Sequence, residues 1–145
     1  MNSNVLVSIK GLHKTQDSED TIQTLQNGQY KNILGNHVIR YEEILEDETL
    51  PEAATVTCML KITPDSVTLT KKGAACTQMQ FARGKTEESV YHTPLGSLHL
   101  TISTTRLEIT QTENQIKVEI AYHLDMNGSP VSQCELSIDI STKEA

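Results

Sequence analysis

The residues of this 145-residue chain that could do chemistry are few, and the densest group is an acidic run that begins at Tyr41-Glu42-Glu43 and continues to Glu52. Carboxylates at this density could hold a hard cation or place an acid in the mouth of a cavity. The run lacks the glycine-bearing ligand spacing of a calcium loop, and charge runs of this kind normally keep a loop solvated. Strand alternation turns one of Glu42 and Glu43 inward, where Arg40, Lys72 or Arg83 would be available as its partner.

Neither the histidines nor the cysteines form a recognisable site. The five histidines show no i, i+2 pair and no H-x-x-x-H spacing, so no metal site is predicted. Cys58, Cys76 and Cys134 have no C-x-x-C spacing and lie in apolar stretches, which predicts three buried thiols in a reducing compartment. The sequence contains neither a G-x-S-x-G motif nor a phosphate-binding loop. Enzymatic activity therefore ranks last among the function classes, and no cofactor is expected.

The charge balance excludes further classes of function. The chain has 12 basic and 19 acidic side chains, for a net charge of -7, and it has no cluster of Lys or Arg. Such a molecule repels a phosphate backbone, so nucleic-acid binding is disfavoured. The sequence has no long apolar run and no signal-peptide pattern at its start. We expect one cytoplasmic domain over residues 1–145, without membrane association.

The elements that would position any site are strands. Thr, Ile and Val supply 38 of the 145 residues, and β-branched side chains favour a pleated surface. Apolar residues alternate with polar ones over residues 116–124 and again over 134–140, with Asn127-Gly128 between these two segments. Because Asn-Gly suits a turn with positive φ, the pattern predicts a hairpin of strands 114–126 and 130–141.

The same reasoning predicts a meander upstream. Thr63-Pro64-Asp65-Ser66 indicates the turn of a second hairpin, and Gly35-Asn36 separates a strand over 30–34 from one over 37–44. The apolar parity changes between Ile102 and Leu107, which predicts a β-bulge at 104–106. Residues 46–54 are interpreted as a loop or a single helical turn.

So many consecutive antiparallel strands must protect two edges and cover one apolar face. Closure into an up-and-down barrel of about 8–10 strands does both. A flattened sandwich is the alternative architecture. The interior of such a barrel is either filled by side chains or open to one small ligand.

Three motifs add a family resemblance. They are the stretch from Gly73 to Gly84 (GAACTQMQFARG), the segment Thr93-Pro-Leu-Gly-Ser-Leu98, and Tyr122-x-Leu-x-Met-Asn-Gly128, all preceded by Tyr41-Glu-Glu. In order and spacing the chain resembles the bacterial YwiB-like family of unknown function over nearly its whole length. The resemblance implies a calycin-like, lipocalin-related β-barrel with no established activity, substrate or catalytic residue. The chain has no Trp, so the Gly-x-Trp signature of secreted lipocalins is missing and their ligands are not carried over.

Function is therefore expected to depend on the interior of the barrel. With one Phe, four Tyr and no Trp, few bulky side chains are available to fill it. We expect a small, partly apolar or anionic ligand at a barrel end lined by Tyr41, Glu43, Arg83 and Tyr91. Arg83 is the proposed anion-binding group, since a guanidinium can bind a carboxylate with two hydrogen bonds. The alternative is a protein-interaction or homodimerisation module whose barrel is filled and binds no ligand.

The stretch Thr77 to Arg83 contains two alternating pairs of side chains. If Met79 and Phe81 face the interior, Gln78 and Gln80 face solvent and the segment is an ordinary strand.

Overall fold

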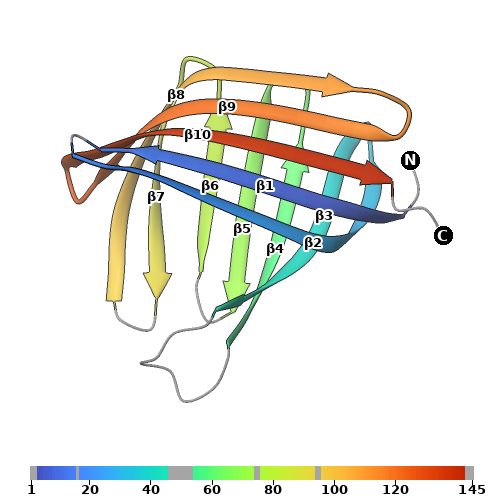
Figure 1. The fold of residues 1–145 in the computed structure, drawn as a ribbon, viewed down its shortest axis with the longest axis horizontal. Coiled ribbons are helices and arrows are strands. Elements are labelled where there is room, and N and C mark those ends of the chain that lie inside the picture. Colours follow the sequence, from blue (N-terminus) through green and yellow to red (C-terminus); the bar gives the residue numbers. More distant parts are fainter. Residues whose placement is uncertain (1–2, 16, 46–53, 74–75, 94–95, 143–145) are drawn as a thin grey trace.

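The computed structural model describes residues 3–15, 17–45, 54–73, 76–93 and 96–142, and nearly all of them are in β-strands (Figure 1). Ten strands follow one another along the chain: β1 (Asn4–Lys14), β2 (Glu19–Ile33), β3 (Asn36–Leu45), β4 (Ala54–Ile62), β5 (Ser66–Gly73), β6 (Thr77–Ala82), β7 (Thr86–Thr93), β8 (Gly96–Gln111), β9 (Gln115–Met126) and β10 (Ser129–Thr142). The chain is all-β, as its composition predicts.

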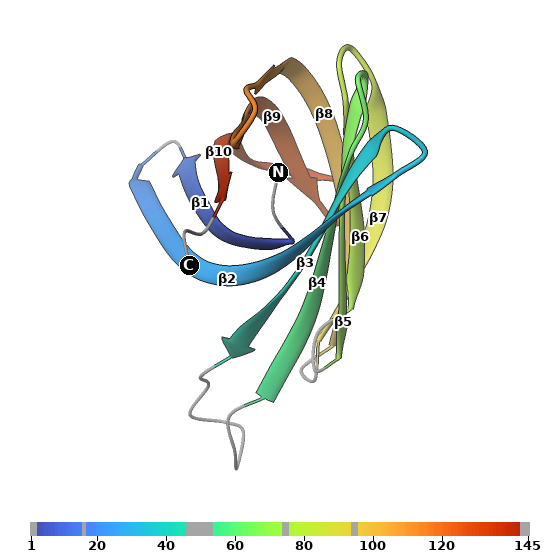
Figure 2. The ribbon, with the colours of Figure 1, turned by 90° about the vertical axis from the view of Figure 1, so that its right-hand side faces the viewer.

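The strands form one antiparallel meander that curls into a nearly closed barrel. Their spatial order is β6-β5-β4-β3-β2-β1-β10-β9-β8-β7, so each strand pairs with its neighbours in sequence except β6 with β7, and β1 also pairs with β10. Figure 2 shows β1, β2 and β10 on one side and β5, β6 and β7 on the other. The predicted barrel is confirmed, and it is the barrel rather than the flattened sandwich that forms.

The barrel has a seam between β6 and β7. In the described part of the chain these strands share a single backbone bridge, from Cys76 to His92. Side chains supplement it, since the Ser89 hydroxyl donates to the carbonyl of Gln78 at 2.5 Å and lies 3.2 Å from the Thr77 hydroxyl. Cys58 and Cys134 are buried, but Cys76 is only half-buried, so the expectation of three buried thiols is wrong there. The reason is its position at the seam, where no neighbouring ladder covers it.

The residues at the turns determine where most of the hairpins form. Asn127 and Gly128 have φ of 52° and 83° and join β9 to β10, as predicted. The turn at residues 63–65 joins β4 to β5, which is also confirmed. The predicted bulge lies in β8, where the register shifts between Thr104 and Arg106. There the Thr105 hydroxyl donates to the carbonyl of Ala121 at 3.1 Å.

One turn is displaced from its predicted place. Leu34 and Gly35, with φ of 53° and 86°, form the turn between β2 and β3, and Asn36 is already the first residue of β3. The prediction at Gly35-Asn36 is wrong by one residue, because a leucine takes the left-handed conformation that sequence statistics reserve for Gly or Asn. The loop predicted over 46–54 lies outside the described residues, except for Ala54 at the start of β4.

The core is the inner face of the barrel. Alternate residues of each strand point inward, and β9 shows the pattern most clearly, with Ile116, Val118, Ile120 and Tyr122 buried between exposed or half-buried neighbours. Across the barrel from β9 lie buried residues of β4 such as Leu60. Alternation with a period of two residues therefore predicts which side chains form the core.

A polar network spans one end of the interior. The Tyr30 hydroxyl lies 2.6 Å from His37 Nδ1, and His37 Nε2 lies 3.0 Å from Gln111 Oε1. Because an amide oxygen only accepts, Nε2 carries the proton, and in the neutral ring Nδ1 accepts from Tyr30. His37 is buried and joins β3 to β8, which are not neighbours in the sheet. The network therefore ties two walls of the barrel together at this end.

Two inward-facing glycines show how unevenly the interior is filled. A Cβ at Gly28 in β2 would lie 2.9 Å from Val7 Cγ2 and 3.1 Å from the carbonyl oxygen of Arg40. A Cβ at Gly11 in β1 would meet only ordinary contacts, the nearest being His13 Nε2 at 3.7 Å. The chain thus needs glycine at position 28 for close approach, whereas there is room for a methyl group at position 11.

This contrast predicts opposite outcomes for one substitution at two sites. Gly28→Ala should lower the free energy of unfolding by about 1–3 kcal/mol, because a backbone carbonyl cannot yield to the new methyl group. Gly11→Ala should leave it within about 1 kcal/mol of wild type or slightly higher, since Ala is less costly than Gly in a strand. Urea denaturation of both variants measures the difference. Equal losses in the two variants would contradict the uneven filling.

Candidate ligand-binding site

A cavity of 310 Å³ lies within the barrel. Its walls come from β1, β2, β3, β4, β5, β6, β9 and β10, and they are mostly apolar. The lining residues are Ile9, Gly11, His13, Ile22, Thr24, Glu43, Leu60, Val67, Leu69, Lys71, Met79, Phe81, Tyr122, Leu136 and Ile138. Met79 and Phe81 line the cavity whereas Gln78 and Gln80 are exposed, so the predicted orientation of β6 is confirmed. The volume is at the small end of the range for ligand pockets.

The polar lining residues gather at one end of the barrel. His13 and Lys71 lie near the ends of β1 and β5, and Glu43 lies near the end of β3. These strands run in the same direction, because each is separated from the next by one antiparallel neighbour. Their C-terminal ends therefore meet at one rim, opposite the end that holds the network of Tyr30 and His37.

An ion pair is the main polar feature of the cavity wall. Lys71 Nζ donates to Glu43 Oε2 at 3.2 Å, and each side chain retains 20% of its exposure. In a mostly apolar wall each charge depends on the other for compensation, because removal of one partner leaves the other poorly solvated. The pair therefore keeps the lining net neutral while exposing a hydrogen-bond donor and an acceptor to the cavity.

Behind the ion pair lies a buried phenol beside a buried thiol. Tyr41 is 2% exposed, and its hydroxyl has no hydrogen-bond partner among the described residues. Burial raises the pKa of Tyr41 far above its ordinary value, and the charges of Cys58 and Glu43 add to the effect. Burial also raises the pKa of Cys58 from 9.0 to about 11, and the nearby Glu43 carboxylate adds to it while Lys71 opposes it. Tyr41 is thus a neutral hydroxyl with unused hydrogen-bonding capacity.

A second polar group lies on the opposite wall. His13, Cys134 and Tyr122 occupy one cross-strand row of β1, β10 and β9. The Cys134 thiol is 3.3 Å from His13 Nδ1 and 3.1 Å from the Ser132 hydroxyl. Burial raises the pKa of Tyr122, and the neighbouring Cys134 adds to the effect. His13 and Tyr122 are the members of this row that reach the cavity.

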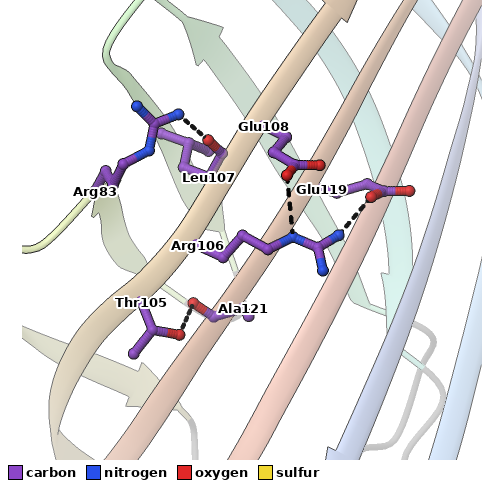
Figure 3. A network of polar contacts seen from close by, with 7 residues as sticks. All are labelled: Arg83, Thr105, Arg106, Leu107, Glu108, Glu119 and Ala121. Atoms are coloured by element: carbon purple, nitrogen blue, oxygen red, sulfur yellow. Dashed lines mark hydrogen bonds and ion pairs between the residues drawn. The ribbon is translucent and has the colours of Figure 1, made fainter.

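The structure brings three of the four predicted site residues to the same rim. Tyr41 and Glu43 lie two residues apart on the inner face of β3, and Tyr91 lies near the end of β7, half-buried against the core. Arg83 is elsewhere, because it follows the last residue of β6 at the other end of the barrel. Its guanidinium donates to the carbonyl of Leu107 in β8 (Figure 3). It is paired with neither Glu42 nor Glu43. Of the four predicted residues, Glu43 lines the cavity, whereas Tyr41, Arg83 and Tyr91 are not among the lining residues.

Lys71 and His13 are the cavity residues that sequence reasoning missed. The signal for Lys71 was present, since Val67, Leu69 and Lys71 share one parity on a strand whose apolar residues face inward. Lys72, which was considered as the partner of the inward carboxylate, has the opposite parity and is exposed. His13 continues the inward parity of Val5, Val7 and Ile9 in the same way.

The described residues offer no other obvious centre. Within them no three His, Cys, Asp or Glu side chains are close enough to hold a metal ion. None of the described segments is a helix of the length and apolarity needed to cross a membrane.

The buried thiol and phenols predict instability at alkaline pH. The folded state keeps protons that the unfolded state releases above the ordinary pKa. The contribution of Cys58 to stability is therefore complete below pH 9 and is lost as pH rises from about 9 to 11, whereas the contribution of Tyr41 and Tyr122 begins to be lost only above pH 10.0. Each such group should lower the free energy of unfolding by up to about 1.4 kcal/mol per pH unit in its own window. Cys58→Ala should show a shallower decline than wild type, measured by urea denaturation between pH 8 and 11. Cys76→Ala is the matched control, and a slope unchanged by Cys58→Ala would contradict the assignment.

Comparison with known proteins identifies the family. A family model described as a domain of unknown function, DUF1934, matches residues 7–138. The solved structure of the ywiB protein from Bacillus subtilis superposes with a TM-score of 0.79 at 18% sequence identity, covering 98% of this chain and 93% of that one. At this identity the likeness shows a shared fold. No curated protein matches significantly. Since the family model covers most of the chain, the protein belongs to the DUF1934 family, whose function is unknown.

Proposed function

We propose that the protein binds a small, mainly apolar molecule that carries one neutral polar group, within the barrel cavity. The observation that supports this is the cavity of 310 Å³ with an apolar wall and the Lys71–Glu43 pair at its polar end. A concave, largely apolar site with a few convergent polar groups is the usual form of a small-molecule site. The apolar part of the ligand would contact residues such as Leu60 and Leu136.

The ion pair favours a neutral polar group over a charged one. An anionic ligand that approached Lys71 would meet the Glu43 carboxylate 3.2 Å from Nζ, and a cationic ligand that approached Glu43 would meet Lys71. An amide or an alcohol can accept from Lys71 and donate to Glu43 without disturbing the pair. Arg83, which motivated the expectation of an anionic ligand, is bonded to Leu107 away from the cavity.

The alternatives have less support. A filled barrel without a ligand is hard to reconcile with the room at Gly11 and the volume of the cavity. An enzyme would need a convergent acid, base or nucleophile that a substrate can reach. The Lys71–Glu43 pair is engaged with itself, and the Cys134 thiol beside His13 is buried and does not line the cavity. Binding is therefore the function that the geometry supports best.

A charge series of ligands of one size tests the proposal. Calorimetric titration with octanamide, octanoate and octylammonium should show that wild type prefers octanamide by about tenfold or more. Glu43→Gln leaves Lys71 without its partner and should move the preference to octanoate, whereas Lys71→Met should move it to octylammonium. Such reciprocal changes are expected only if the polar group of the ligand lies at the ion pair.

Blocking the cavity provides the matched control. Leu136 lines the cavity, whereas Glu135, its neighbour in β10, is exposed on the outer face. Leu136→Trp should abolish binding of octanamide, and Glu135→Trp should retain it. Failure of all three ligands to bind the folded wild-type protein, or binding that survives Leu136→Trp, would refute the proposal.

A further inference from the structure

The outer surface of the barrel carries a second hollow, separate from the cavity inside. We call it the β2–β4 groove; it has a volume of 620 Å³ and includes Lys31, Ile33, Leu34, Arg40, Met59 and Lys61. These side chains point outward from three adjacent strands. Lys31 and Lys61 both lie level with Val38, and Arg40 lies level with Met59. The turn between β2 and β3, which borders the groove, projects from the body of the barrel in Figure 2.

Three large apolar side chains are exposed to solvent around the groove. Leu34 is 97% exposed, Ile33 is 50% exposed and Met59 is 45% exposed. Half of the large hydrophobic side chains that are exposed in the described part of the chain thus border this one groove. Leu34 also has φ of 53°, a conformation that costs energy for leucine and that Gly or Asn would adopt more easily. Burial of Leu34 against a partner would offset that cost.

The groove is also positively charged in an acidic protein. Lys31, Arg40 and Lys61 form no ion pair with any described residue, although the chain has a net charge of -7. Three cations without a described ion-pair partner, around exposed apolar side chains, fit an acidic segment that contains apolar residues. The chain itself contains such a segment between Leu45 and Ala54, with the sequence EDETLPEA.

The segment cannot readily fill the groove of its own molecule. Leu45 and Ala54, which flank it, are paired neighbours in β3 and β4, so a chain of this length that leaves and returns there extends at most about 16 Å. Lys31 and Lys61 lie level with Val38, which is seven residues from Leu45 along β3, or about 23 Å at ~3.3 Å per residue. The segment could thus reach only the Arg40 end of its own groove, and the end with Lys31 and Lys61 is open to another molecule.

We propose that two copies of this chain associate through their β2–β4 grooves, with the acidic segment 46–53 of each copy bound in the groove of the other. Leu45 and Ala54, which flank the segment, lie at one end of β3 and β4, and Lys31 and Lys61 lie toward the other end. A two-fold axis across β3 therefore brings the end that carries the segment in one copy over the basic end of its partner. Such an arrangement is isologous and closes at the dimer. It is independent of the ligand proposed for the cavity, because the groove and the cavity lie on opposite faces of the sheet and share no lining residue.

Sedimentation equilibrium tests the proposal directly. Wild type should be a dimer at micromolar concentration, and its dissociation constant should rise as salt increases from 0.05 to 0.5 M, because the contact is electrostatic. Lys61→Glu should weaken the dimer by about tenfold or more. Lys72→Glu is the matched control, since it makes the same change of charge at an exposed position of β5 outside the groove, and it should leave the dimer intact.

A charge exchange distinguishes the groove from any other interface. The variant Lys31→Glu with Lys61→Glu should be monomeric, and so should the variant Glu46→Lys with Glu48→Lys. Mixing the two should restore a heterodimer, because the reversed segment then meets the reversed groove. A wild-type monomer at 100 µM would overturn the proposal. So would a dimer that Lys61→Glu leaves unchanged, or one that the mixture does not restore while both variants keep the wild-type circular dichroism spectrum.

Discussion

The antiparallel pairing of β1 with β10 is the interaction on which the rest of the structure depends. It runs from Val5 opposite Thr142 to Lys14 opposite Gln133 and joins the two ends of the chain. Without it the sheet would divide into β1–β6 and β7–β10, connected only at the seam, and β1 and β10 would each present a long unpaired edge, a form prone to association. With it the inner faces of β1 and β10 lie opposite those of β4, β5 and β6, and the space between them becomes an interior.

The barrel closes at two places that differ in strength, the β1–β10 ladder and the seam between β6 and β7. The β1–β10 ladder is continuous and strongly constrains the register, whereas the seam holds by one backbone bridge and a few hydroxyl contacts. The interior is equally uneven. One end is tied by the network of Tyr30, His37 and Gln111, whereas the ion pair of the cavity lies toward the other end.

Much of this fold could be predicted from the sequence, because its determinants are local. Period-two alternation identifies the inner face, Asn127-Gly128 suits its turn, and the change of parity in β8 requires a bulge. The displaced turn at Leu34-Gly35 could not be predicted in this way, since leucine at positive φ violates the preference on which the prediction rests. The alternation of apolar and polar residues also does not predict which neighbours an exposed side chain contacts.

The candidate site could be predicted only in part, because it depends on which end of the barrel each residue reaches. Parity requires that one of Glu42 and Glu43 faces inward, and the structure shows that it is Glu43, with Tyr41 buried on the same face of β3. Arg83 was assigned to the same rim, but the short strand β6 ends just before it at the opposite end, where the carbonyl of Leu107 accepts its hydrogen bond. The partner of Glu43 was predicted wrongly, because Lys72 was considered although the parity of β5 turns Lys71 inward. The direction of each strand determines which end of the barrel a residue reaches, and this end, rather than the residue type, determines whether the residue belongs to the site.

The central claim is that the barrel contains an unfilled apolar cavity, and a crystal exposed to xenon under pressure tests it most directly. Dry apolar cavities take up xenon, whereas filled or hydrated ones do not. We expect xenon density between Leu60, Phe81 and Leu136, with the Glu43–Lys71 pair unchanged at its edge. An interior without xenon, filled by repositioned side chains or by ordered water, would contradict the account.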